Sequence, residues 1–200
     1  ADSTGYGNLC PKYSTLQCLE ILYNAWYGLK SDTTSTLLDL DIRYFATGSI
    51  ESVLGRLLYS ENDSSACSKQ NLNTFPNYDH AFYRINSSER LWDGWPPYYS
   101  SSNLTTLQNT LDKTPVIIRI KNYDQIKDEV QSTSYHGGII PMPSTGSDWH
   151  YVVAVNYGTN GDTTFVECMN SFGVGAGEGT YIPNGFGDFF RVSTDNFSYW

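Results

Sequence analysis

Apolar positions near the start of the chain recur at helical spacing. One stripe, with steps of three and four residues between residues 10 and 29, consists of Ser14, Cys18, Ile21, Leu22, Ala25, Trp26 and Leu29. Pro11 suits the first helical position, where its missing N–H is not needed, so Cys10 is predicted at the N-cap. Three further elements are expected before Pro115: a helix at Ile50 to Tyr59, irregular coil over 60–103, and a short helix at Leu104 to Leu111. The N-terminal half is therefore predicted to be mainly helical.

The pattern changes after Pro115 to apolar runs that are typical of strands. Strands are predicted at 116–120, 151–157, 164–169 and 188–192, with glycine-rich turns between them. A helical half followed by antiparallel strands indicates an α+β arrangement of two lobes, 1–103 and 104–200. A cleft between the lobes would be the expected place for a ligand.

Candidate chemistry lies at the ends of three of these elements. His150 precedes one apolar run and Asn170 follows another, and antiparallel neighbours of this length could hold an imidazole and a carboxamide side by side. Cys10 supplies a thiol at a helix N-terminus, where the helix dipole stabilises a thiolate. In this hypothesis Cys10 attacks a carbonyl, His150 protonates the leaving amine, and Asn170 orients the imidazole. This scheme depends on a lowered pKa of the Cys10 thiol.

Composition and charge exclude several classes of function. Hydrophobic residues make up 40% of the 200-residue chain and aromatic residues 15%, which indicates a folded protein. A net charge of −9 argues against nucleic acid as a partner, because few side chains could neutralise phosphates. No apolar run approaches the length of a membrane span. No pair of His, Cys or Asp residues has metal-ligand spacing, so neither a metal nor a cofactor is expected.

Sequons and cysteines indicate the compartment. Four sequons begin at Asn62, Asn86, Asn103 and Asn196. With few lysines, they favour a secreted glycoprotein, or one in a lysosome-like compartment. The chain begins with Ala1, Asp2 and Ser3, which would suit a freshly cut mature N-terminus. The other cysteines are Cys18, Cys67 and Cys168. If Cys10 is a thiol, one bridge and one buried thiol remain. The rival count is two bridges and no nucleophile, and the sequence leaves both open.

These residues resemble the papain family of cysteine peptidases over nearly the whole chain. In the C-terminal half, the matching segments are His150 to Gly158, Asn170-Ser171-Phe172-Gly173, Gly177-Glu178, Tyr181, Thr114-Pro115-Val116 and Gly137-Gly138-Ile139. In the N-terminal half, the matches to Cys10 as nucleophile are Ser14, Glu20, Gly28 and Leu37-Leu38-Asp39. The resemblance implies a helical lobe and an antiparallel β-barrel lobe with a cleft between them. It also implies that Gly48 and Phe172 contact a polypeptide substrate, with Gly48 pairing with the extended chain through its backbone.

The chain departs from the family pattern near the implied site. Thr4 stands where the family has its oxyanion-hole glutamine, and loss of one such donor costs about 10²- to 10³-fold in rate. Pro11 and Phe172 replace tryptophans, and Ala176 replaces a second tryptophan beside the asparagine. The cysteines that brace the nucleophile loop are absent, with Gly7 and Leu40 approximately at those positions.

Two hypotheses follow from this resemblance. The first is a secreted cysteine endopeptidase that acts through a thiolate–imidazolium pair of Cys10 and His150. The second is a papain-like glycoprotein that has lost catalysis and has a structural, filament-forming or binding role. Only nine residues precede Cys10, so a strand from a neighbouring copy of the chain could complete the barrel lobe. The expected partner is therefore a polypeptide substrate or a second copy of the chain.

Overall fold

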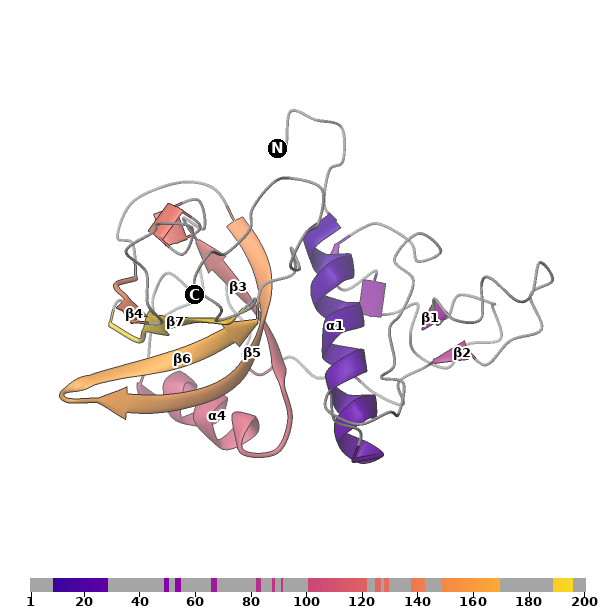
Figure 1. Ribbon diagram of the computed structural model, residues 1–200, viewed down its shortest axis with the longest axis horizontal. Helices are drawn as coiled ribbons and strands as arrows, with labels where there is room; N and C mark the ends of the chain where they lie inside the picture. Colours follow the sequence, from indigo (N-terminus) through magenta and orange to yellow (C-terminus); the bar gives the residue numbers. More distant parts are fainter. Residues whose placement is uncertain are drawn as a thin grey trace. The chain divides into compact units, whose positions relative to one another are not determined.

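The structure is a computed structural model with two compact units, Ala1–Glu89 and Arg90–Trp200. It describes residues 9–28, 49–50, 53–54, 66–67, 82–83, 88, 91, 101–121, 125–126, 128–129, 138–142, 149–169 and 189–195. Figure 1 shows the helices and strands along the chain. The lobe boundary predicted after residue 103 stays a prediction.

The first unit contains the long helix α1, Leu9–Trp26. It ends in a turn where the Gly28 N–H donates to the Ala25 carbonyl at 3.1 Å and Gly28 has a φ of 64°. A glycine commonly ends a helix in this left-handed conformation, because it has no Cβ to clash. The predicted helix is confirmed, but its first helical residue is Leu9 and not Pro11, and it ends at Trp26 and not at Leu29. Cys10 therefore lies within the first turn and not at the N-cap.

The buried face of α1 differs from the predicted stripe. The buried residues of α1 are Pro11, Lys12, Ser14, Thr15, Leu16 and Leu19, and of these only Ser14 belongs to that stripe. Trp26, at the other end of the stripe, is 85% exposed, and Leu22 is exposed as well. Leu16 and Leu19 are also spaced as on one helix face, so the spacing of apolar residues could not distinguish the two faces.

Two other parts of the first unit test the sequence predictions. Ile50, Val53 and Leu54 are helical, as predicted, and the rest of 50–59 lies outside the described residues. The coil predicted over 60–103 is wrong at two points, since β1, Ala66–Cys67, pairs antiparallel with β2, Phe82–Tyr83. Strands of two residues are too short for an alternating pattern, so the sequence carries no signal for them.

The described part of the second unit contains a five-stranded sheet in the order β3-β5-β6-β7-β4. Its strands are β3 (Val116–Lys121), β4 (Ile139–Ile140), β5 (Trp149–Asn160), β6 (Thr163–Met169) and β7 (Phe189–Ser193). The four predicted strands are confirmed, with their ends shifted by one to three residues. The sheet is mixed and not purely antiparallel, because β4 runs parallel to β7. Parallel strands need a long crossover connection, and β5 and β6 lie between β4 and β7 in the chain.

The longest strand, β5, combines a tight hairpin with a β-bulge. It pairs with β6 through a two-residue turn that contains Gly161, with a φ of 60°. The register shifts between Ala154 and Asn156, so Val155 is the extra residue of a β-bulge. Val152 and Ala154 reach the core before this shift, and Tyr157 packs against the core after it.

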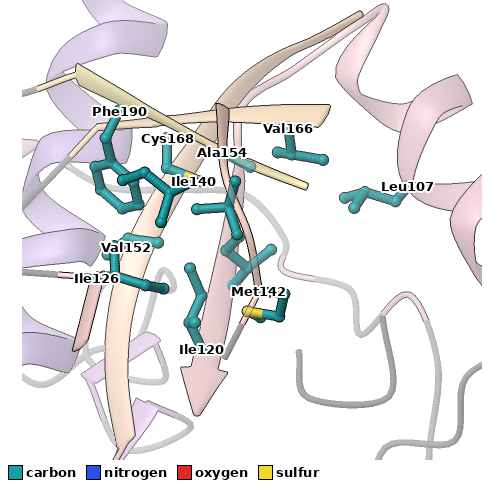
Figure 2. Packing of buried hydrophobic residues seen from close by; sticks show 12 residues of the cluster. Leu107, Ile120, Ile126, Ile140, Met142, Val152, Ala154, Val166, Cys168 and Phe190 are labelled. Carbon is teal, nitrogen blue, oxygen red and sulfur yellow. The ribbon is translucent and has the colours of Figure 1, made fainter. Parts of the chain in front are cut away.

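An apolar cluster lies on one face of this sheet and includes residues from β3, β4, β5, β6 and β7 (Figure 2). Ile120, Val152, Val166, Val192 and Cys168 are fully buried in it. Helix α4, Ser101–Leu111, contributes Leu107 and packs against β5 and β3. The helix predicted at 104–111 is therefore confirmed with an earlier start, and it ends before Pro115 as predicted.

Candidate active site

Cys10 lies in the first turn of α1, as its second residue. Its side chain is half-buried, and it carries a thiol. The first N–H groups of a helix have no intrahelical acceptor, and together with the helix dipole they favour negative charge at this end. Pro11 fits the same turn because the N–H it lacks would have no intrahelical acceptor there. The surroundings of Cys10 on α1 are therefore compatible with a thiolate.

Burial suppresses ionisation at two other cysteines. Desolvation raises the pKa of Cys18 to about 12, from an ordinary value of 9.0. Cys168 is fully buried in the core beside Glu167, and burial, followed by the nearby carboxylate, raises the pKa of this thiol strongly. The thiolate is the reactive form of cysteine, so both side chains are poor nucleophiles.

The cysteine count of the structure differs from both expectations. Cys10, Cys18 and Cys168 are thiols, whereas the side chain of Cys67 lies outside the described residues. One bridge plus one buried thiol would place Cys18 or Cys168 in a disulfide, and two bridges would use both. The structure therefore supports neither count.

His150 is the second residue of β5 and is only 5% exposed. Its Cα partner on β3 is Ile120. Because successive strand residues point to opposite faces, His150 shares a face with Val152 and Ala154, which belong to the core. The imidazole is thus held at the end of the core face of the sheet, a more buried position than the sequence alone indicated.

The opposite face of β5 carries a feature that sequence reasoning missed. Tyr151 follows His150, and its Cα partner on β3 is Arg119. The guanidinium carbon of Arg119 lies 5.9 Å from the centre of the Tyr151 ring, a cation–π contact. The available signal was the single charged residue inside the apolar run 116–120, because a cation within such a strand needs a polarisable or polar neighbour.

The structure places Cys10 in the first unit and His150 in the second. The other residues predicted for the site, Thr4, Gly48, Asn170 and Phe172, lie outside the described residues. Strand β6 ends at Met169, directly before Asn170, and Met169 is the Cα partner of Val153 on β5. The strands that carry His150 and lead to Asn170 are therefore antiparallel neighbours, as the sequence predicted.

Of the four sequon asparagines, Asn103 lies in the first turn of α4 and is half-buried. Asn62, Asn86 and Asn196 lie outside the described residues. Within the described ranges there is no group of three His, Cys, Asp or Glu residues that could hold a metal ion. In the same part of the chain no helix is long and apolar enough to cross a membrane.

No protein-family model matches the sequence, and no curated protein matches it. Solved structures do match. The cysteine protease CMS1MS2 of Carica candamarcensis, in complex with E-64, aligns with a TM-score of 0.58 and 18% identity over 94% of this chain and 80% of that chain. The chain has the papain-like fold.

Two further structures share the papain-like fold. Digestive procathepsin L 3 of Tenebrio molitor larval midgut aligns with a TM-score of 0.52 and 15% identity over 94% of this chain. A structure concerning antibody cross-reactivity between the mite allergens Blo t 1 and Der p 1 aligns with a TM-score of 0.51 and 15% identity over 92% of this chain. The alignments span 59% and 58% of those two chains. The resemblance drawn from the sequence motifs is therefore confirmed for the fold.

Proposed function

We propose that the chain is a secreted papain-like cysteine endopeptidase that hydrolyses extended polypeptides. The observation that carries the proposal is the papain-like fold, which extends over 94% of the chain. In that fold the thiol of Cys10 stands at the start of an 18-residue helix, and His150 stands at the start of a core strand. The proposal includes a helical lobe, a β-barrel lobe and a cleft between them that binds the substrate.

The reaction begins at Cys10. Its thiolate attacks the carbonyl carbon of a peptide bond and forms a tetrahedral oxyanion, to which the backbone N–H of Cys10 donates a hydrogen bond. The imidazolium of His150, oriented by Asn170, gives its proton to the amine as the C–N bond breaks. The remaining thioester is then hydrolysed by water, from which His150 takes a proton. Thr4 supplies a weaker oxyanion donor than a glutamine would.

Substrate binding and localisation complete the proposed function. Gly48 pairs through its backbone with the substrate, and Phe172 shields the His150–Asn170 hydrogen bond from water. Secretion agrees with the sequons, and Asn62, Asn86, Asn103 and Asn196 are the proposed glycosylation sites. Of these, Asn103 lies half-buried in the first turn of α4.

A thiol-reactive peptidyl electrophile tests the enzyme directly. One equivalent is expected to label Cys10 of the wild-type protein, and His150→Ala is expected to slow that labelling. Cys18→Ala is the matched control, because it removes a thiol from the same helix and leaves Cys10 in place. Labelling of Cys10 at the same rate in the wild-type protein and in His150→Ala would contradict the thiolate–imidazolium pair.

One observation favours a second function, in which the fold is kept and catalysis is lost. His150 is 5% exposed and lies on the core face of β5, which is also where a purely structural histidine would be found. In such a protein the peptidyl electrophile leaves Cys10 unlabelled, and His150→Ala lowers the free energy of unfolding. The chain would then serve as a glycoprotein with a structural or binding role, with a second copy of the chain as one partner. Sedimentation at high concentration would reveal filaments.

A further inference from the structure

Two buried hydroxyl groups bond to the backbone next to Cys10. Ser14 is fully buried, and its one O–H is shared between the carbonyl oxygens of Cys10, 2.8 Å from Oγ, and of Pro11, 3.2 Å from Oγ. Thr15, which is 2% exposed, donates from Oγ1 to the Pro11 carbonyl at 2.6 Å. The acceptors of both hydroxyls are thus the carbonyl of the proposed nucleophile and the next carbonyl along the helix.

These bonds restrain the backbone on the C-terminal side of Cys10. The pyrrolidine ring of Pro11 fixes the φ angle of that residue near −65°. The Ser14 hydroxyl then holds the peptide groups on both sides of Pro11, because it reaches both carbonyls. With these peptide groups fixed, the directions of the Cys10 N–H and of its Cα–Cβ bond depend on few remaining torsions.

A role in helix stability alone explains this arrangement poorly. Serine and threonine that bond back to carbonyls slightly destabilise helices, and alanine has a higher helix propensity at such positions. The hydroxyls are nevertheless buried at the turn that carries the proposed nucleophile. The Cys10 N–H is also the main oxyanion donor left where Thr4 stands in place of glutamine, so its direction matters more in this chain.

We propose that Ser14 is a positioning residue for Cys10, an inference that rests on the proposed function. Its hydroxyl holds the carbonyls of Cys10 and Pro11 and thereby directs the Cys10 thiol and N–H toward the substrate carbonyl. Thr15 stabilises the same turn but does not contact the Cys10 carbonyl through its hydroxyl. The two residues therefore form a natural comparison.

The experiment compares Ser14→Ala with Thr15→Val, each of which removes one buried hydroxyl from this turn. The rates of Cys10 alkylation by a peptidyl electrophile and by iodoacetamide, and kcat and KM for a peptide substrate, are measured well below the unfolding temperature. The Tm of each variant is measured separately by thermal unfolding. Ser14→Ala is expected to lower kcat and both alkylation rates about tenfold, with little change in KM, since small misplacements of reacting groups cost this much or more. Thr15→Val is expected to change these rates by less than about twofold. Ser14→Thr restores a hydroxyl and is expected to recover most of the rate.

The proposal is overturned if Ser14→Ala and Thr15→Val slow the reactions by the same factor. It is also overturned if the decrease in rate of each variant is proportional to its decrease in Tm. If wild-type Cys10 does not react with the peptidyl electrophile, the proposed function fails. The iodoacetamide rates still report whether Ser14 directs the thiol. The two failures are therefore distinguishable.

Discussion

Alkylation of the native protein separates its cysteines by burial. The thiolate is the species that reacts, so the rate at fixed pH follows the thiolate fraction. Burial raises the pKa of Cys18 from 9.0 to about 12. At pH 8 this lowers the thiolate fraction from about 10⁻¹ to about 10⁻⁴, a decrease of about 1,000-fold. Cys168, fully buried and with a strongly raised pKa, is expected to react still more slowly. Cys10, half-buried at the N-terminus of α1, is expected to be modified well before either.

The assay is a time course with iodoacetamide at pH 8, followed by peptide mass spectrometry that quantifies each cysteine separately. The same reaction in denaturing urea provides the reference, in which Cys10, Cys18 and Cys168 react at similar rates. The rate of Cys18 in the native protein is expected to rise about tenfold for each unit of pH, because its thiolate fraction does. If Cys18 reacts within about tenfold of Cys10 in the native protein, the burial argument is wrong.

Three further predictions concern stability. The folded protein holds the Cys18 proton to about pH 12 and the unfolded chain only to about 9, so stability is lost as pH rises above 9. From pH 8 to 10 the unfolding free energy should fall by about 1.4 kcal/mol more in the wild-type protein than in Cys18→Ala, as urea titrations can measure. Gly158→Ala would place its Cβ 2.9 Å from the Phe165 Cζ, and we expect a loss of about 1 kcal/mol that shrinks in a Phe165→Leu background. Glu167→Gln removes the 3.0 Å ion pair with Arg191, whose side chain is 45% exposed; thermal unfolding should show a loss below about 1 kcal/mol that disappears at high salt.

Strands and turns in the second half of the chain could be predicted because their signals are local. The run 116–120 is rich in β-branched residues, and the hairpin turn falls where Asn160 and Gly161 stand between two apolar runs. Pro115 marks the end of the helix before it. Features that depend on distant segments could not be predicted, since neither the parallel pairing of β4 nor the two-residue pairing of β1 with β2 leaves a local pattern.

The candidate site shows the same division. The residue types of Cys10 and His150 and their positions at the start of elements could be predicted, because a helix start and an apolar strand are visible in the sequence. The burial of His150 could not, since it depends on the core that forms around β5. Ser14 was placed on an apolar stripe by its spacing, and its bonds to the Cys10 and Pro11 carbonyls follow only from its buried position in the folded helix. A serine four residues after a candidate nucleophile is a signal that could have been used.

The β-bulge at Val155 determines which insertions and deletions in β5 the sheet can accommodate. On either side of Val155 the partners on β6 follow one another without a gap, since Ala154 pairs with Cys168 and Asn156 with Glu167. Deleting Val155 would therefore remove the bulge and leave Tyr157 on the core face, whereas deleting one residue between His150 and Ala154 would turn His150 away from the core. Shortening the strand by two residues keeps the alternation and is the milder change. In engineered or homologous chains, insertions and deletions are therefore expected at the bulge or at the hairpin turn after Asn160, and not between His150 and Ala154.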